Sequence, residues 1–384
     1  MYDNQKDSQL IHLALDMTNL SSGGSISILL RYMEQWNSFG IKMTVFYVRD
    51  TIGNEIKAAN LPVTLVQIGS GWPSWKIFLY RNFRLYKVIC DSGAQILYCV
   101  NSMLLRCPIP QIVHMRNLQH FNSKSFLGQL LTGGIYEALR DYMCRYSVRH
   151  AQSSVFISNY LQKAAIKTCP SANPDGFKVI YNPISSEMLD SVKTPEIISN
   201  YDNSIVLGVF NDYPHKDTPA FLRTLSNLHK SAPERNWQGI IIGNGDWSKY
   251  DSLISELHLQ GSIAFPGYVP SAETSRFYKK AFCLLSTSKL EAFNNTPLES
   301  MAYSCPVVIT SCCAHPEVVE DAGLFFPPGD PDAATDCILR LYRDKKLYED
   351  FVHRGRLNLR RFLPEDSARA FYELFKKSYK TISQ

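Results

Sequence analysis

The chain has 384 residues, of which 45% are hydrophobic and 20% are charged, and these proportions exclude a disordered tail or a fibre. Because a domain holds about 100–200 residues, the length predicts two domains of similar size. The net charge of +5 comes from 40 Lys and Arg against 35 Asp and Glu, and it is too small by itself to indicate nucleic-acid binding.

The basic excess is confined to the first half, because residues 1–190 carry 18 Lys and Arg against 12 Asp and Glu. The 10 cysteines show no metal-ligand spacing, and we expect reduced thiols in a cytoplasmic protein. The polar N-terminus does not resemble a signal peptide, and no run reaches the roughly 18–20 apolar residues of a membrane span. We therefore expect that the protein meets a membrane, if at all, from the cytosolic face.

Short apolar runs alternate with helical patterns along the first half, which is typical of a parallel sheet covered by helices on both faces. The predicted strands lie at residues 11–15, 43–48, 63–68, 96–100, 111–114, 154–157 and 178–181. A polar stretch with a proline follows over residues 185–204 and is predicted to be a linker.

The second half repeats this alternation. Its predicted strands lie at residues 204–209, 237–242, 262–265, 282–286, 306–310 and 323–326, and helices are expected to begin near Thr218, Ser248, Ser271, Thr296 and Pro331. The pattern predicts an α/β protein with two Rossmann-like domains, over residues 1–188 and 200–363. Ligands of such sheets bind at the carboxyl ends of the strands, so functional residues are expected on the loops there.

The most informative segment joins the strand at residues 282–286 to the helix near Thr296. Its loop carries Glu291, and the first turn of the helix carries Glu299 next to Pro297. A helix start with free backbone N–H groups is a natural seat for a phosphate. Two carboxylates would repel a phosphate unless they bind hydroxyl groups instead, and sugars and riboses supply such groups.

Glu291 and Glu299 form an E-x7-E motif that resembles the retaining glycosyltransferases of family 4. Further segments match the order of that family's signatures: Ser22-Gly23-Gly24, His114, Val179-Ile-Tyr-Asn182-Pro183, Ile241-Ile-Gly243-Asn-Gly245, Phe265-Pro-Gly267-Tyr268-Val269 and Pro316-Glu317 through to Asp330. The resemblance implies a GT-B fold, in which two Rossmann-like domains face across a cleft and a C-terminal helix, residues 364–384, crosses back to the first domain.

The resemblance also implies donor-binding roles. Glu299 would bind the nucleotide ribose and Glu291 the donor sugar. The other residues that would face the donor are Gly23, Gly24, Gly243, Tyr268, Val269, Asn294, Asn295 and Thr296. The alternative is that neither glutamate binds a ligand. Glu299 would then be a first-turn carboxylate that the helix dipole favours, and Glu291 would be a solvated loop residue. The chain has Ala292-Phe293-Asn294 where the family commonly has Gly-Phe-Gly, so it departs from the family in the loop that would face the sugar.

Lys216 is the expected stabiliser of the leaving diphosphate, because it follows the first strand of the second half. The family usually pairs this lysine with an arginine a few residues earlier, and that arginine is missing here. His114 would lie against the reacting sugar, although a histidine at a strand end can equally be a structural residue. Arg116 and Asn117 are candidates for binding the acceptor.

Asp330-Pro331-Asp332 has the D-x-D form of a metal-binding motif, but a turn followed by a helix N-cap explains it better. We expect no essential metal and no cofactor. Residues 72–87 combine aromatic and basic side chains, as does a second stretch over residues 140–149. Such a segment suits either a helix on an anionic membrane or a helix packed against the first sheet.

The sequence thus predicts a retaining, metal-independent hexosyltransferase. It would use a nucleoside-diphosphate sugar and a glycan or lipid-linked acceptor in polysaccharide synthesis, without nucleic acid. The alternatives are a nucleotide-sugar epimerase on the same fold and a non-catalytic partner of another transferase.

Overall fold

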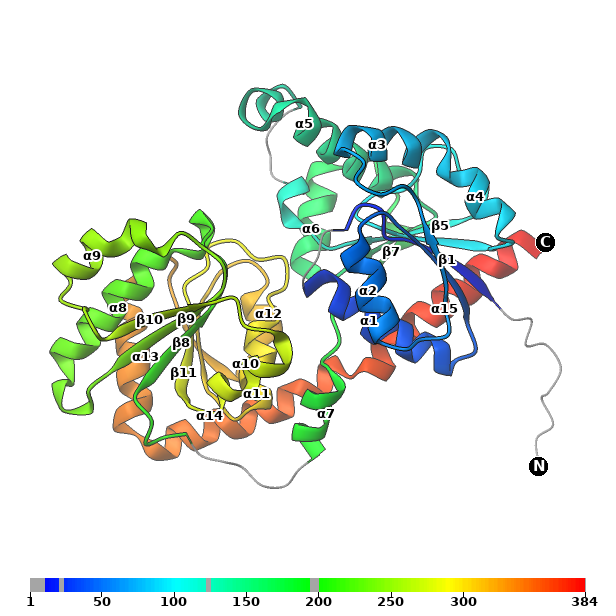
Figure 1. Cartoon of the computed structure of the whole chain (residues 1–384). Coiled ribbons are helices and arrows are strands. Elements are labelled where there is room, and N and C mark those ends of the chain that lie inside the picture. Colours follow the sequence, from blue (N-terminus) through cyan, green and yellow to red (C-terminus); the bar gives the residue numbers. More distant parts are fainter. Residues whose placement is uncertain (1–10, 21–23, 122–125, 194–199, 384) are drawn as a thin grey trace, which may run out of the picture. The chain divides into compact units, whose positions relative to one another are not determined.

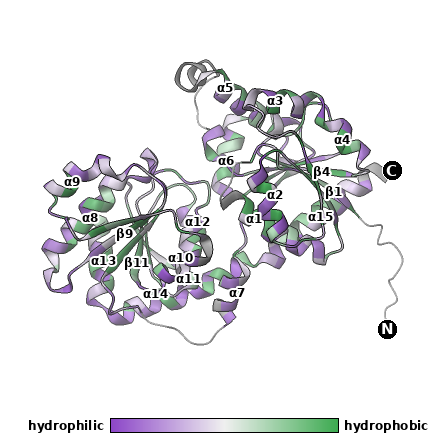
Figure 2. Ribbon diagram, in the orientation of Figure 1, coloured by the Kyte–Doolittle hydropathy of each residue, from purple (hydrophilic) through white to green (hydrophobic). Residues whose placement is uncertain are grey.

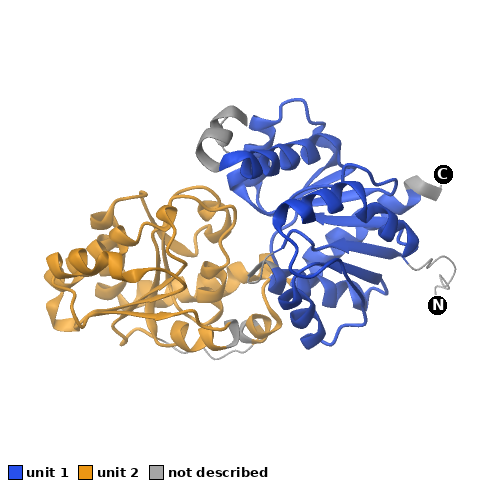
Figure 3. Cartoon of the chain, turned by 45° about the horizontal axis from the view of Figure 1, so that its top comes forward, with its two compact units in different colours: residues 1–183, 364–384 blue, residues 184–363 orange. Residues whose placement is uncertain are grey.

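The computed structural model describes residues 11–20, 24–121, 126–193 and 200–383. The chain divides into two compact units (Figure 3). Unit 1 comprises residues 1–183 and 364–384, and unit 2 comprises residues 184–363.

Unit 1 is built on a parallel sheet with the strand order β3-β2-β1-β4-β5-β6-β7. The strands are β1 (His12–Asp16), β2 (Lys42–Tyr47), β3 (Thr64–Gln67), β4 (Ile96–Val100), β5 (Gln111–Met115), β6 (Ser153–Phe156) and β7 (Phe177–Val179). In the register of the sheet, Leu13 lies between Met43 and Ile96. Every residue of β1, β4 and β5 is buried, and these strands are mostly apolar in sequence (Figure 2).

The helices of unit 1 are α1 (Gly24–Ser38), α2 (Asp50–Ala58), α3 (Ser74–Phe83), α4 (Leu85–Asp91), α5 (Phe126–His150), α6 (Asn159–Thr168) and the C-terminal α15 (Pro364–Ser383), with short 3-10 turns η1 (Leu118–Phe121) and η2 (Pro174–Gly176). Helix α15 packs against α1 (Figure 1). The ring of Phe371 lies 5.0 Å from Tyr32, and that of Phe375 lies 5.2 Å from Trp36. The last helix therefore completes the core of unit 1, as the GT-B expectation required.

Unit 2 is a second parallel sheet, with the strand order β10-β9-β8-β11-β12-β13. Its strands are β8 (Ile205–Val209), β9 (Gln238–Ile242), β10 (Ile263–Gly267), β11 (Ala281–Ser286), β12 (Val307–Thr310) and β13 (Gly323–Phe326). The order places the first strand of this unit beside its fourth. The carboxyl ends of these two strands form the switch point at which open α/β sheets bind ligands.

The helices of unit 2 are α7 (Ser186–Lys193), α8 (Thr218–Ser231), α9 (Asp251–Glu256), α10 (Ser271–Tyr278), α11 (Thr296–Ala302), α12 (His315–Val319), α13 (Pro331–Arg343) and α14 (Lys345–Asn358). Four 3-10 turns complete the unit: η3 (Pro214–Lys216), η4 (Pro233–Arg235), η5 (Trp247–Tyr250) and η6 (Leu359–Phe362).

The prediction of a linker over residues 185–204 is wrong in its first part, where α7 forms. The hydroxyl of Ser185 accepts the backbone N–H of Met188 at 3.3 Å, which caps the start of the helix. The Met188 side chain is buried, and α7 contacts α11 within unit 2. The helix is only eight residues long, which gives a helical period little room to show in the sequence.

The expectation of a single helix over residues 72–87 is also wrong. The segment divides into α3 and α4 at Arg84, whose φ of −126° and ψ of −38° interrupt the helix. Arg81, one of the basic residues of this segment, is only 3% exposed. Among the described residues, no helix is long and apolar enough to cross a membrane.

Candidate functional site

The loops after β8 and β11 bring Lys216 and Glu291 together. Lys216 ends the turn η3 after β8, and Glu291 lies in the loop after β11. The two strands are direct neighbours in the sheet, with Leu207 paired to Leu284. The ammonium of Lys216 donates to a carboxylate oxygen of Glu291, and the two side chains are only 18% and 14% exposed. The predicted cation and the predicted sugar-binding carboxylate therefore form one partly buried ion pair.

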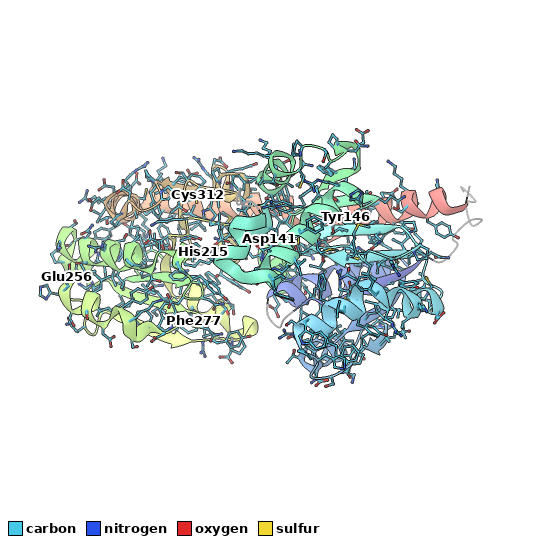
Figure 4. The ribbon with its side chains drawn as sticks, turned by 90° about the horizontal axis from the view of Figure 1, so that it is seen from above. Asp141, Tyr146, His215, Glu256, Phe277 and Cys312 are labelled. Atoms are coloured by element: carbon cyan, nitrogen blue, oxygen red, sulfur yellow. The ribbon has the colours of Figure 1, made fainter. Side chains whose placement is uncertain are left out.

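Backbone contacts fasten these two loops to each other. The N–H of Lys289 donates to the carbonyl of His215 at 2.7 Å, and the Thr287 hydroxyl donates to the carbonyl of Lys216 at 2.7 Å. A second ion pair joins Lys289 to Asp217 at 2.7 Å. Burial, followed by the charge of Lys216, lowers the pKa of His215, which is labelled in Figure 4. The position of Lys216 is thus fixed by the backbone as well as by its partner.

Asn294 occupies the position at which the family commonly has glycine. Its φ is 71°, in the left-handed region that asparagine tolerates better than most residues. The side-chain oxygen of Asn294 accepts the N–H of Thr296 at 3.2 Å and its hydroxyl at 2.9 Å. The asparagine therefore keeps the backbone turn of a glycine and adds side-chain hydrogen bonds to Thr296, the first residue of α11.

A buried histidine orients the Asn294 amide. Nδ1 of His315 lies 3.0 Å from the carbonyl oxygen of Thr310, which can only accept, so Nδ1 carries the proton. Nε2 is then the acceptor for the Asn294 amide at 3.1 Å. Burial lowers the pKa of His315 to about 4, so the ring stays neutral near pH 7. Sequence analysis missed His315, because nothing local marks it as a partner of a residue on another loop.

The start of α11 offers fewer donors than the phosphate-seat prediction assumed. The N–H of Thr296 is bonded to Asn294, and Pro297 has none. The N–H of Glu299 donates to the carbonyl of Asn295 at 3.1 Å. A phosphate near this loop would therefore depend more on Lys216 than on the helix end.

Glu299 is held by a tyrosine that sequence analysis did not single out. The hydroxyl of Tyr278, at the end of α10, donates to a carboxylate oxygen of Glu299 at 2.9 Å. Tyr278 is fully buried, and burial together with Glu299 raises the pKa of its phenol. The carboxylate thus has a fixed orientation before any ligand binds.

Gly243 directly follows β9, at the same edge of the sheet. Its φ is 147°, and a Cβ atom there would lie 2.0 Å from the carbonyl oxygen of Phe210, so only glycine fits. Tyr268 and Val269 follow β10, and the Tyr268 side chain is 66% exposed. These residues share an edge of the sheet with Lys216, and their donor-binding roles stay predictions.

His114 lies inside unit 1 and is fully buried. The Tyr98 hydroxyl lies 2.5 Å from Nδ1 of His114, and the centre of the Phe371 ring lies 5.2 Å from the centre of the imidazole. Burial, followed by the charge of Arg116, lowers the pKa of His114 well below the usual range. These surroundings favour the interpretation of His114 as a structural residue, and its catalytic role stays a prediction.

The other residues predicted in unit 1 lie at the carboxyl ends of its strands. The N–H of Arg116 donates to the side chain of Asn101 at 2.8 Å, and the Asn117 side chain accepts the N–H of Gln119 at 3.0 Å. Gly24 is the first residue of α1, whereas Gly23 lies outside the described residues. The acceptor and phosphate roles of these residues stay predictions.

A buried ion pair that sequence analysis did not single out lies at the same edge of unit 1. Asp16 ends β1, and its carboxylate accepts from the Arg81 guanidinium at 2.6 Å. It also accepts the hydroxyl of Thr18 at 2.6 Å. Arg81 donates further to the hydroxyl of Ser102 at 3.1 Å and to the carbonyl of Met103 at 3.3 Å. The pair joins α3 to the loops after β1 and β4.

The D-x-D segment acts as the expected cap, because Asp330 accepts the N–H of Ala333 at 2.9 Å at the start of α13. Asp332 accepts from Asn227 at 2.7 Å. Within the described residues, no cluster of three or more His, Cys, Asp or Glu side chains could hold a metal ion. All ten cysteines are free thiols, and the thiol of Cys312 (Figure 4) lies 3.2 Å from the carbonyl of Ser288.

The comparisons with known proteins agree with this architecture. Residues 203–344 match the family model described as "Glycosyl transferases group 1". The chain is 25% identical over 280 residues to O-antigen chain mannosyltransferase B of Escherichia coli, covering 59% of this chain and 72% of that protein. It is also 25% identical over 199 residues to O-antigen chain mannosyltransferase RfbU of Salmonella typhimurium, covering 51% of this chain and 53% of that protein.

Solved structures share the fold over nearly the whole chain. Anabaena HepE in complex with UDP has a TM-score of 0.70 at 16% identity, covering 96% of this chain and 100% of that one. WaaG, a glycosyltransferase involved in lipopolysaccharide biosynthesis, has a TM-score of 0.68 at 15% identity, covering 93% and 98%. The chain therefore has the GT-B fold of such glycosyltransferases, and together with the family-model match the comparisons support a glycosyltransferase class.

Proposed function

We propose that the chain is a retaining glycosyltransferase. It would move a hexosyl residue from a nucleoside-diphosphate sugar to a hydroxyl of a glycan or lipid-linked oligosaccharide, in cell-surface polysaccharide synthesis. The observation that carries the proposal is the Lys216–Glu291 ion pair at the switch point of the sheet in unit 2, within the residues that match the family model. The names of the two O-antigen mannosyltransferases and the UDP bound to Anabaena HepE support it.

The chemistry follows from an exchange of partners. Before the donor binds, Glu291 neutralises Lys216. The donor would supply a diphosphate for the cation and sugar hydroxyls for the carboxylate, so both groups would keep a partner. As the glycosidic bond breaks, negative charge grows on the leaving diphosphate, and a fixed cation there stabilises the transition state. The acceptor hydroxyl would attack from the same face and pass its proton to the leaving phosphate, which gives retention.

Nucleotide recognition is assigned to Glu299, whose carboxylate would accept hydrogen bonds from the ribose hydroxyls. The Tyr278 hydroxyl donates to one of the Glu299 carboxylate oxygens at 2.9 Å, so the side chain of Glu299 loses less conformational entropy when the ribose binds. The proposed reaction uses no essential metal and no cofactor.

The experiment that tests the donor site is the thermal shift of the full chain with UDP, GDP, ADP, CMP and dTDP in EDTA. A ligand at about 100 times its Kd adds about 2.7 kcal/mol of stability, which raises Tm by a few degrees. We expect one nucleotide to raise Tm, and Glu299→Ala to abolish the shift. The matched control is Glu256→Ala, at an exposed position on α9 (Figure 4) that should leave the shift intact.

Turnover is tested separately with the donor that binds. Transfer to a panel of glycan acceptors, with the anomeric configuration of the product read by NMR, supports the proposal if the configuration of the donor is kept. Inversion would contradict retention, and release of an epimerised sugar would indicate an epimerase. Binding without any transfer would favour a non-catalytic partner.

A further inference from the structure

The turn that ends in Lys216 carries an exposed aromatic ring. Tyr213, directly before η3, is 55% exposed. The other large apolar side chains that the structure shows as exposed in unit 2 are Tyr268, after β10, and Leu357, on α14. Of these three residues, only Tyr213 lies on a loop that carries a member of the Lys216–Glu291 ion pair.

A histidine beside the ion pair supports the Tyr213 ring. The Tyr213 phenol and the His215 imidazole are stacked, with 5.7 Å between the ring centres and 6° between the ring planes. Burial lowers the pKa of His215, and the charges of Lys216 and Glu291 both act on that pKa. The imidazole is therefore close to the ion pair, and it continues the aromatic surface from Tyr213 to the candidate site.

Hydrogen bonds of the backbone hold this turn in place. The N–H of Lys216 donates to the carbonyl of Tyr213 at 2.9 Å. The carbonyl of His215 accepts the N–H of Lys289 at 2.7 Å and the hydroxyl of Ser288 at 3.3 Å. The stacked rings thus belong to a constrained turn, which reduces the conformational entropy lost when a ligand binds to them.

An exposed aromatic face next to a carboxylate and an ammonium suits a sugar. The face of an aromatic ring is electron-rich, and the C–H groups on one face of a pyranose ring carry the positive ends of their dipoles, so the two surfaces attract each other. The hydroxyl groups of such a sugar need hydrogen-bond partners nearby. Glu291 and Lys216 are partners of this kind, but they are recessed at 14% and 18% exposed, whereas Tyr213 is open to solvent.

We propose that a sugar ring of the acceptor stacks on Tyr213. The inference rests on the proposed function, in which the acceptor hydroxyl passes its proton to the leaving phosphate. That phosphate is assigned to Lys216, so the acceptor must lie beside the turn that holds Lys216, and Tyr213 is the exposed ring on that turn. The donor is assigned to other groups, because its sugar meets Glu291 and its base lies beyond the ribose at Glu299.

Saturation-transfer difference NMR tests the stacking. The full chain is mixed with the nucleoside diphosphate found by thermal shift and with the methyl glycosides of glucose, galactose and mannose as acceptor probes. We expect saturation to reach mainly the C–H protons on one face of the sugar, because a stacked aromatic ring contacts one face only. Tyr213→Ala should remove most of this saturation, whereas Tyr213→Phe should keep it, since the ring is retained.

Steady-state kinetics separate the acceptor from the donor. Tyr213→Ala should raise the KM for a glycan acceptor about three- to tenfold, the range expected for the loss of one aromatic stacking contact. The KM for the donor and the Tm shift with the nucleoside diphosphate should stay unchanged, and Tyr213→Phe should restore the acceptor KM. The matched control is Leu357→Ala, which removes an exposed apolar side chain of the same unit and should change neither KM.

The inference fails while the proposed function stands if a parent chain that binds the nucleotide transfers no saturation to the three glycosides, or if Tyr213→Ala transfers as much as the parent. It also fails if folded Tyr213→Ala loses the Tm shift with the nucleotide, because Tyr213 would then stack on the base of the donor. Absence of a Tm shift with every nucleotide in the parent chain would instead overturn the proposed function together with the inference.

Discussion

His315 holds Asn294 in place across two loops of unit 2, with 3.1 Å between the imidazole Nε2 and the amide nitrogen. The histidine follows β12, whereas the asparagine begins the turn into α11. Because Nδ1 must donate to Thr310, the ring can offer only an acceptor to Asn294. The side-chain oxygen of Asn294 is thereby directed at Thr296, at the start of the helix that carries Glu299.

Substitutions at Asn294 should separate two contributions to stability: the left-handed backbone conformation at this position and the side-chain hydrogen bonds to Thr296. Asn294→Gly keeps the left-handed backbone but loses the side-chain hydrogen bonds to Thr296, which costs about 0.2–0.5 kcal/mol. Asn294→Ala loses both and should cost about 1–2 kcal/mol more. The free energy of unfolding in urea should therefore fall in the order Asn, Gly, Ala. Equal stability of the glycine and alanine variants would show that the positive φ is not required.

Acid should destabilise the protein through His315. Its pKa is about 4 in the folded chain against about 6.5 when unfolded, so the unfolded chain binds a proton between these values and the folded chain does not. The free energy of unfolding is unaffected above about pH 6.5 and should fall by up to about 3 kcal/mol as the pH drops to 4. Urea unfolding at several pH values measures this slope.

His315→Gln should flatten that slope, although it lowers stability at neutral pH. His353→Gln is the control, because His353 is exposed on α14. An unchanged slope in the His315 variant would place the acid sensitivity elsewhere, with His114 as the next candidate, since its pKa is lowered in the same direction.

Removing the cation of the candidate site should affect turnover more than donor binding. Lys216→Met should lower kcat at least about a hundredfold, since a charge that opposes the leaving group acts mainly in the transition state. Lys249→Met is the matched control, because Lys249 forms an ion pair with Asp212 on the same unit but is 46% exposed. The measurement is steady-state transfer with the donor identified by thermal shift.

Lys216→Met has two effects that must be distinguished: it breaks the ion pair with Glu291, and it removes the cation that would stabilise the leaving group. Lys216→Met leaves Glu291 partly buried without its cation, whereas Lys216→Met/Glu291→Gln removes both charges. The double variant should regain stability and remain inactive. Recovery of kcat in the double variant would mean that Lys216 is a structural partner of Glu291 and no electrophile.

Arg81→Met should be among the most destabilising single changes in unit 1. It leaves the Asp16 carboxylate buried and unpaired, at a cost of about 3–5 kcal/mol. Arg84→Met, three residues away and exposed, should stay within about 0.5 kcal/mol of the parent chain. Urea unfolding compares the two. A small effect of Arg81→Met would indicate that Asp16 takes up a proton or finds water, and that the pair does not orient α3.

The layered parallel sheets could be predicted from the sequence alone, because strands that are buried on both faces are mostly apolar. The strands found here lie within about two residues of the predicted runs at most ends. The sequence also indicated the loops that hold Lys216, Glu291 and Glu299, because each follows a recognisable strand or opens a helix with proline.

Which side chains meet depends on how the strands and loops are arranged in space. Lys216 and Glu291 are 75 residues apart, and their contact depends on β8 lying beside β11. His315 and Tyr278 have no local signal, because their partners come from other loops. The orientation of α3 likewise depends on a buried ion pair between residues 65 apart, and local hydrophobicity left both orientations open. Hydrophobic periodicity indicates which face of a helix is buried on average. A single buried ion pair can reverse that orientation, because turning the helix over would leave a carboxylate unpaired in the core.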